Sequence, residues 1–448
     1  MTPWTDLPAH RAWLDDEARR LLTFGLRAGL PGGGAAYLDD DGRPDPAHGV
    51  QTWITCRTAH VYSLGALLGI PGCGPVADAA LAGLTGPLRD AEHGGWFHAV
   101  GTDGTPDTAA GKSCYDHAFV MLAASSAALA GRPGGAELLA EATRVYLERF
   151  WDDDAGRPVD TWDVEFGTCD DYRGLNATMH SVEAMLAVAD AADALTPEFP
   201  GATLADDEVQ GATTSFPGIG RVPATETSWS TSKPRGDGAV WRERAARAVG
   251  FVARLAAEHD GRLPEHFGPD WTPELDLNRD RPGDQFKPYG ATPGHGLEWS
   301  RLILQLEAST GEDPGLLATA TALFDRAVAD AWAADGAEGF VYTTGWDGAP
   351  VVRTRMHWVL AEAIGAAAAL YTRTGEVRFA GWYARWWDYA ERYLIDRERG
   401  SWRHELDPAN APSSAVWPGK PDLYHAFQIT LLPRLPLAPS LAASLRRV

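Results

Sequence analysis

Six histidines recur along the chain in one setting, at the end of a polar loop and near the start of an apolar run. The imidazole side chain has an ordinary pKa of about 6.5, so it can take up and release protons near neutral pH. Several such histidines around one ligand could carry out general acid–base chemistry, in which a well-placed group accelerates a reaction roughly 10²–10⁴-fold. The six are His60, His117, His180, His295, His357 and His425.

The apolar runs that follow these histidines predict helices. Runs such as HAFVMLAASSAALAG and HWVLAEAIGAAAALYT are rich in apolar and small residues, as expected for helices buried on most sides. Successive histidines are separated by 57, 63, 115, 62 and 68 residues. Only the third interval is out of line, and it contains a Gly-, Pro-, Ser- and Thr-rich stretch at 196–240. We expect that stretch to be an inserted loop or lid.

A repeat of about 60 residues accommodates two helices and a connecting loop. Six repeats predict an all-α fold, an (α/α)6 toroid of six inner and six outer helices, built by residues 1–448 as one domain. Amphipathic segments such as 241–258 and 377–394 are expected to be outer helices, and short strand-like segments such as GFVYTTGWDG to form hairpins at the mouth. Since a toroid brings the starts of its inner helices to one rim, all six histidines are expected to converge on one cleft.

Composition restricts the class of partner. The formal net charge of −22 argues against nucleic acid and against an anionic membrane surface, because both require a basic face. No run approaches the ~18–20 apolar residues of a membrane span, and we expect no signal peptide at the N-terminus. The cysteines form no CxxC pair and indicate reduced thiols of a cytoplasmic protein; they are Cys56, Cys73, Cys114 and Cys169.

Four strings of the sequence carry a family resemblance. They are RTAHVYSLG, NATMHSVEA, FKPYGATPGHGLEWSRL and WPGKPDLYHAFQ. Together, over about residues 53–428, they resemble the N-acylglucosamine 2-epimerase superfamily, and within it most closely the branch of mannose isomerases and sulfoquinovose isomerases. The resemblance implies an (α/α)6 barrel that isomerises or 2-epimerises sugars without a cofactor.

The resemblance also implies roles for particular residues. His295 and His425 match the family's catalytic pair, and His180 matches a third functional histidine. We expect His425 to move the proton between C2 and C1 through a cis-enediol and His295 to open the sugar ring, with an exchange of these two roles as the alternative. The residues expected to bind substrate are Arg57, Asn176, Glu298, Tyr115, Trp53 and Trp358.

The chemistry of these side chains agrees with such roles. Glu298 lies three residues after His295, so a helix places both on nearly one face, where the carboxylate could orient an imidazole. The Arg57 guanidinium could hold sugar oxygens as a bidentate fork or stabilise an enediolate. Asp422 is expected mainly to cap the helix that carries His425, because Asp is a preferred N-cap residue.

The favoured reaction is conversion of D-mannose to D-fructose, with D-lyxose to D-xylulose as a related one. The expected partner is a small-molecule monosaccharide, and the chain is expected to act as a monomer or small homo-oligomer. Lys287 stands where an enzyme for a sulfonated sugar would be expected to carry an arginine, which favours a neutral sugar. Other residues expected around the C6 group of the sugar are Gln285, Phe286 and His404.

Other functions stay open as alternatives. A 2-epimerase, of the glucose/mannose or the N-acylglucosamine type, shares the enediol, and a sulfoquinovose isomerase belongs to the same branch. A glycoside hydrolase on the same toroid would need two carboxylates, but it leaves the recurrent histidines without a role. The sequence has neither an HExxH string nor the Cys/His spacing of zinc sites, so no metal or other cofactor is expected. Candidate hydrolase carboxylates are Asp116, Asp163, Glu298 and Asp422.

Overall fold

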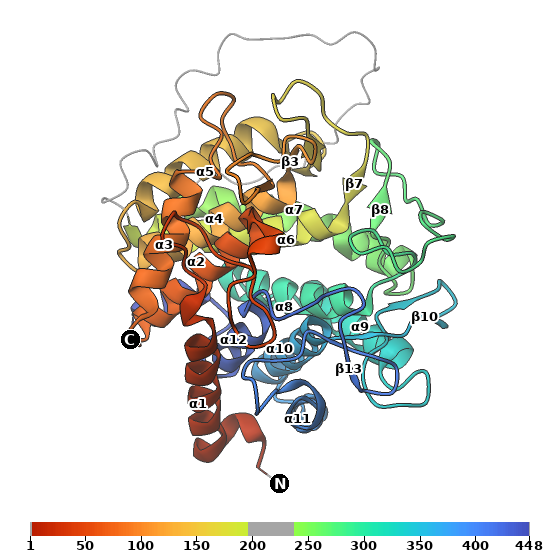
Figure 1. Ribbon diagram of the computed structural model, residues 1–448. Helices are drawn as coiled ribbons and strands as arrows, with labels where there is room; N and C mark the ends of the chain where they lie inside the picture. Colours follow the sequence, from red (N-terminus) through yellow and green to blue (C-terminus); the bar gives the residue numbers. More distant parts are fainter. Residues whose placement is uncertain (1, 196–236, 448) are drawn as a thin grey trace.

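The computed structural model describes residues 2–195 and 237–447 (Figure 1). Their inner layer is a ring of six helices in which each helix contacts the next and the last contacts the first. The ring consists of α2 (Thr52–Leu67), α4 (Cys114–Leu129), α6 (Leu175–Leu195), α8 (Pro293–Thr310), α10 (His357–Thr374) and α12 (Tyr424–Leu431).

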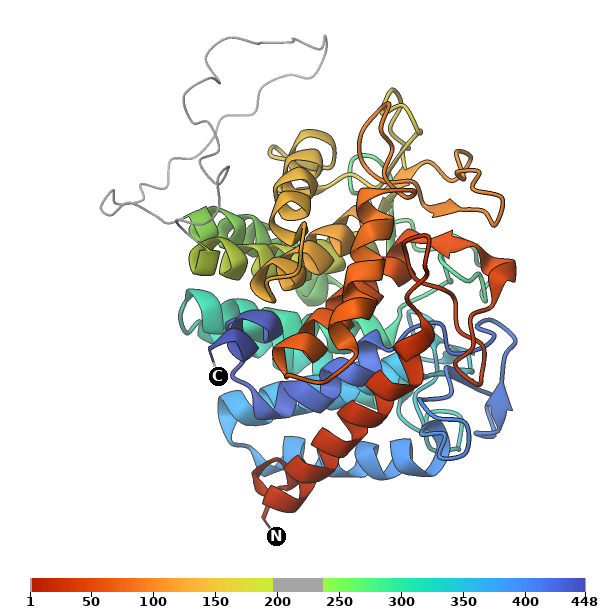
Figure 2. The same ribbon diagram turned by 60° about the vertical axis from the view of Figure 1, so that its left-hand side comes forward.

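An outer helix packs against each helix of the ring. The N-terminal helix α1 completes the outer layer by packing on α12, so the first long helix of the chain lies beside the last helix of the ring (Figure 2). The outer helices are α3 (Cys73–Thr85) on α2, α5 (Gly135–Arg149) on α4, α7 (Asp237–Glu258) on α6, α9 (Pro314–Ala331) on α8, α11 (Val377–Tyr389) on α10 and α1 (Pro8–Phe24) on α12. A last short helix, α13 (Leu441–Arg446), contacts α2, α4 and α6.

Short antiparallel strands fix the places where inner helices begin. A strand directly before α2, α4, α6 and α10 pairs with a strand from the loops of the following repeat. These pairs are β1 (Val50–Gln51) with β2 (Ala99–Val100), β3 (Lys112–Ser113) with β6 (Thr161–Trp162), β7 (Arg173–Gly174) with β8 (His266–Phe267), and β11 (Arg355–Met356) with β12 (Glu405–Leu406), which also pairs with β13 (Pro412–Ser413). Two further hairpins are β4 (Trp151–Asp152) with β5 (Arg157–Pro158) and β9 (Thr343–Thr344) with β10 (Pro350–Val352).

Local sequence explains the two kinds of helix. Inner helices are apolar all round because they are enclosed by the ring and the outer layer; in α10, residues 359–370 are all buried. Capping residues set some of the starts. The Ser113 side chain accepts a hydrogen bond from the Asp116 backbone N–H at the start of α4, and Pro293 opens α8.

The predicted (α/α)6 toroid is confirmed, and so are the outer helices predicted at 241–258 and 377–394, the second of which ends in a π-helical turn. Of the predicted insertion, 196–236 lies outside the described residues, while 237–240 form the first turn of α7. That the whole chain is one domain stays a prediction.

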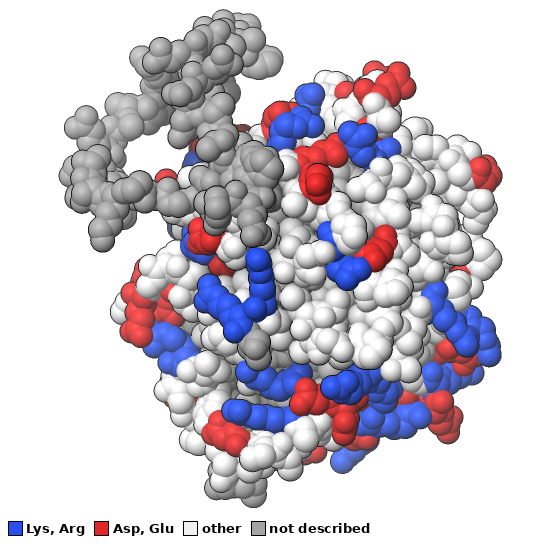
Figure 3. All heavy atoms as spheres, turned by 90° about the vertical axis from the view of Figure 1, so that its left-hand side faces the viewer, with Lys and Arg blue, Asp and Glu red and all other residues white. Residues whose placement is uncertain are grey.

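Three further observations concern the chain as a whole. All four cysteines are free. In the described part of the chain, none of the helices has the length and apolar character needed to cross a membrane. On the face shown in Figure 3, acidic and basic side chains are intermixed, so that face offers no purely basic surface.

Candidate active site

A cavity of about 340 Å³ lies at the end of the ring where the inner helices begin. The first turns of the inner helices and the loops between them form its walls. Every residue that the sequence predicted for the site is in its lining: His295, His425, His180, Arg57, Asn176, Glu298, Tyr115, Trp53 and Trp358.

Four of the six recurrent histidines line this cavity, namely His180, His295, His357 and His425. The prediction that all six converge is wrong for the other two. His60 lies eight residues beyond the start of α2, about 12 Å deeper at 1.5 Å per residue, and lines a separate cavity of about 40 Å³.

His117 is the second exception, because its ring faces a loop instead of the cavity. Its Nδ1–H donates to the Ser113 carbonyl oxygen over 2.7 Å, and its Nε2 accepts from the Trp96 backbone N–H over 3.2 Å. Both ring nitrogens are therefore used within the protein. Two loop histidines join the cavity instead: His404, which was expected there, and His98, which sequence reasoning missed.

His425 is the most enclosed of the predicted catalytic pair. Its Nδ1–H donates over 2.9 Å to Oε1 of Glu362, a buried carboxylate on α10. That bond fixes the tautomer and leaves Nε2 as a proton acceptor. Burial, with the nearby Arg57 cation, holds the pKa of His425 well below its usual range, so the imidazole is neutral at neutral pH.

His295 also has a carboxylate near Nδ1, but as an ion-pair contact without a hydrogen bond. Its Nδ1 lies 2.9 Å from Oε2 of Glu265, which directly precedes β8. The ring of Trp358 lies near both catalytic candidates, with its centroid 5.1 Å from that of His295 and 5.9 Å from that of His425. The cavity therefore presents two imidazoles, each with a carboxylate at Nδ1, on either side of one indole.

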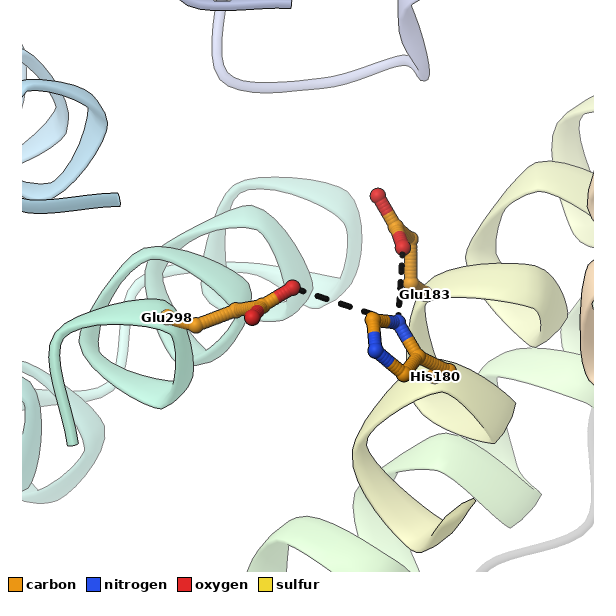
Figure 4. A group of neighbouring side chains, drawn as sticks. All are labelled: His180, Glu183 and Glu298. Carbon is orange, nitrogen blue, oxygen red and sulfur yellow. Dashed lines mark hydrogen bonds and ion pairs between the residues drawn. The ribbon is translucent and has the colours of Figure 1, made fainter. Parts of the chain in front are cut away.

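Glu298 contacts a different imidazole from the one expected. It approaches His180, with Oε1 4.0 Å from Nδ1, while Nδ1 of His180 also donates to Glu183 over 3.5 Å. Figure 4 shows His180 pointing between Glu183, from its own helix, and Glu298, from α8. Tyr424 donates its hydroxyl hydrogen to Glu183 from the other side.

The surroundings shift the pKa values of the two carboxylates beside His180 in opposite directions. Burial and the neighbouring Glu362 raise the pKa of Glu298 well above its usual range. Burial also disfavours the charge of Glu183, but the hydrogen bond from His180 and the nearby Arg301 outweigh it and lower the pKa of Glu183. The surroundings of a single imidazole thus favour the neutral form of Glu298 and the charged form of Glu183.

Arg301 joins the carboxylates beneath the cavity. Its Nε–H donates to Glu362 over 2.8 Å and its Nη2–H donates to Glu298 over 3.3 Å, with the guanidinium almost fully buried. Sequence reasoning missed Arg301, Glu362, Glu183 and Glu265 as parts of the site. The i, i+3 spacing of Glu298 and Arg301 was visible, but their partners lie on other helices or loops.

Metal binding is a separate question for these groups. Among the described residues, two overlapping sets could offer three ligand atoms each. Arg301 already pairs with Glu298 and Glu362, and the pKa of Glu298 favours its protonated form. The negative charge that would attract a divalent cation is therefore largely compensated. The sets are His180, Glu183 and Glu298, and Glu298, Glu362 and His425.

Arg57 is held rigidly at the cavity wall. Its Nη1–H donates to Asp422 over 3.1 Å, its Nη2–H donates to the Tyr115 hydroxyl over 2.9 Å, and its guanidinium lies 4.9 Å from the Trp53 ring centroid. The other oxygen of Asp422 accepts from the backbone N–H of Tyr424, the first residue of α12, but the N-cap position itself is Leu423 and not Asp422 as predicted. Asp422 therefore links the orientation of Arg57 to that of the helix carrying His425.

Another part of the cavity wall carries charged side chains. Lys287 lies with its Nζ 3.6 Å from the Tyr172 ring centroid, and Asp160 lines the same region. His98 pairs with Asp116 over 2.8 Å, which raises its pKa to about 9 and makes it a cation. Of the candidate hydrolase carboxylates, Asp116 and Asp163 are absent from the cavity lining, whereas Glu298 and Asp422 are part of it.

Comparison with known proteins identifies the family. Residues 33–199 and 230–429 match the family model described as N-acylglucosamine 2-epimerase (GlcNAc 2-epimerase). Because the match spans well over half the chain, the protein belongs to this family, as the four sequence strings predicted.

Relatives within the family are more specific. The chain is 49% identical to a D-mannose isomerase of Thermobifida fusca over 451 residues, with 100% of each chain covered. It is 42% identical to a D-mannose isomerase of Pseudomonas cannabina pv. alisalensis, covering 99% of this chain and 97% of that one. A crystal structure of a D-mannose isomerase superposes with a TM-score of 0.79 at 23% identity, covering 96% of this chain and 99% of that chain, which supports the toroidal fold.

Proposed function

We propose that this protein is a cofactor-free aldose–ketose isomerase that converts D-mannose to D-fructose, with D-lyxose to D-xylulose as a second reaction. The observation that carries the proposal is the pair His295 and His425, each with a buried carboxylate at Nδ1, facing one sugar-sized cavity. Full-length relatedness to D-mannose isomerases supports the choice of sugar.

The proposed reaction begins with ring opening. His295, oriented by Glu265, passes a proton from O1 to O5 so that the C1 aldehyde forms. Trp358 lies against the histidine and offers a flat apolar surface to the sugar. Asn176 and His180 hold hydroxyl groups from the opposite wall.

Proton transfer between carbons follows. The neutral imidazole of His425 removes the C2 proton, so the C2–H bond breaks as the C1 carbonyl becomes an enediol oxygen. The same imidazole then delivers that proton to C1, while the hydrogen of O2 passes to O1, so that O2 becomes the ketone oxygen and O1 the C1 hydroxyl. Arg57 stabilises the negative charge that develops on the enediol oxygens, and Glu298 contacts the sugar from the same cavity lining.

The test is to incubate the protein with D-mannose in D2O and follow the products by NMR. We expect fructose to accumulate, with deuterium entering at C1 whenever the proton on His425 exchanges with solvent. Mannose recovered unchanged, without deuterium at C2, would refute the proposal.

A 2-epimerase is the second candidate, because the family model that matches is named for that activity. It shares the enediol but returns the proton to the opposite face of C2. Glucose as the main product of the same experiment would select it over the isomerase. A sulfoquinovose isomerase is less favoured, since Lys287, which packs on the Tyr172 ring, stands where that enzyme would be expected to carry an arginine.

The proposed location and oligomeric state of the enzyme are those expected from the sequence. Free thiols support the predicted cytoplasmic location, and we propose a monomer or small homo-oligomer acting on a free monosaccharide.

A further inference from the structure

Two histidines stack on the cavity wall beside His425. The rings of His357, the first residue of α10, and His404, next to β12, have centroids 3.8 Å apart and planes 22° from parallel. The ring centroid of His357 is 6.3 Å from that of His425. Both stacked residues line the cavity, and the reaction described above uses neither.

Backbone carbonyls determine the tautomers of the stacked pair. Nδ1 of His357 lies 3.2 Å from the carbonyl oxygen of His404, and Nε2 of His404 lies 3.2 Å from the carbonyl oxygen of Asp422. A carbonyl can only accept, so each of these two nitrogens carries the hydrogen. Nε2 of His357 is therefore unprotonated and can accept a hydrogen bond. None of the described residues donates a hydrogen bond to it.

The surroundings keep His357 in this state. Burial lowers its pKa to about 4, so it takes up no second proton near neutral pH. Pairing of β11 with β12 and a 3.0 Å hydrogen bond from the His357 backbone N–H to His404 fix the ring against the neighbouring loop. An acceptor held this rigidly at the cavity wall is suited to bind one hydrogen-bond donor of a ligand selectively.

We propose that His357 contacts the substrate directly, its Nε2 accepting a hydrogen bond from one hydroxyl of the sugar near the carbons on which His425 acts. The proposal rests on the isomerase function proposed above and adds a specificity-determining residue to it. A site built around such a hydrogen bond discriminates against an analogue that lacks the hydroxyl, because the buried acceptor is then left unpaired.

A matched pair of variants separates this role from a structural one. In His357→Asn, the amide nitrogen occupies the place of Nδ1 and keeps the bond to the His404 carbonyl, but the acceptor facing the cavity is lost. In His357→Gln, the amide oxygen reaches the place of Nε2 and keeps the acceptor, but the bond to His404 is lost. We expect His357→Asn to lower kcat/KM for D-mannose about tenfold with an unchanged Tm, and His357→Gln to lower Tm while retaining most of the activity.

Deoxy sugars identify the hydroxyl concerned. The unchanged protein should lose kcat/KM on one member of the set 3-, 4- and 6-deoxy-D-mannose, and His357→Asn should treat that member and mannose alike. Wild-type kcat/KM in His357→Asn, or equal losses on every deoxy sugar in both proteins, would overturn the inference. If the unchanged protein does not turn over mannose at all, the proposed function fails first and this inference fails with it.

Discussion

His60 and His117 belong to the same series of six recurrent histidines as His295 and His425, yet their surroundings are opposite. The first two are enclosed by protein: His60 bonds to Ser126 through Nδ1, and His117 uses both ring nitrogens on neighbouring backbone. The other two have a carboxylate at Nδ1 and line a cavity large enough for a sugar.

Depth along the helix accounts for much of this difference. His425 and His295 are the second and third residues of their helices, whereas His60 is the ninth residue of α2. Only side chains in the first turns reach the rim where the inner helices begin. His117 lies in the first turns of α4 as well, so its depth does not exclude it from the cavity. It is excluded because its ring points towards a loop. A repeated histidine therefore becomes functional only at the right depth and on the right face.

Replacing the cavity histidines gives the largest expected effect. We expect His425→Ala and His295→Ala each to lower kcat for D-mannose by about 10³-fold, because each removes a general acid–base group. Both variants should retain the Tm of the unchanged protein within a few degrees. The measurement is turnover by NMR together with thermal unfolding.

A substrate without a ring distinguishes the two roles. D-glyceraldehyde cannot close a ring through its own hydroxyls, so ring opening is dispensable for it. His295→Ala should lose much less activity on this triose than on mannose, whereas His425→Ala should lose activity on both. If His425→Ala is instead the variant that recovers, the two assignments must be exchanged.

The repeat of about 60 residues was sufficient to predict the toroid. Six apolar helices at regular spacing can be buried together in few other arrangements. The family resemblance likewise predicted nine residues that line one cavity, because its four strings lie on inner helices or at their starts. The contacts that could not be predicted are those between residues of different repeats. Glu265 and Glu362 meet their histidines only after the ring closes, and no spacing within one string relates Glu362 to His425.

The enclosed histidines should affect stability instead of turnover. We expect His117→Leu to lower the free energy of unfolding by about 2–4 kcal/mol, because it leaves the Trp96 N–H and the Ser113 carbonyl without their partner. His60→Leu is the matched control and should cost less, since it removes one hydrogen bond, to Ser126. Urea unfolding measures both. A large loss of kcat in His117→Leu with unchanged stability would contradict this division of roles.

The smallest effect is in the acid dependence of stability, and it tests whether the enclosed histidines are neutral. Burial lowers the pKa of His117 to about 4, below the ordinary value of about 6.5 that it regains on unfolding. Between those values the unfolded chain binds a proton that the native state does not, so stability falls as the pH is lowered from 6.5 towards 4. His98 has the opposite sign, because Asp116 raises its pKa to about 9, so its contribution is complete below pH 6.5 and is lost progressively as the pH rises from 6.5 to about 9.

His117→Leu should therefore make the acid decline of the unfolding free energy shallower, by up to about 1.4 kcal/mol per pH unit. His98→Asn should leave that acid decline unchanged and remove part of the loss between pH 6.5 and 9. Unfolding curves at pH 5, 6, 7 and 9 compare the slopes directly. Parallel acid slopes for His117→Leu and the unchanged protein would mean that the fold does not lower the pKa of His117, and the contrast between enclosed and cavity histidines would have to rest on their positions alone.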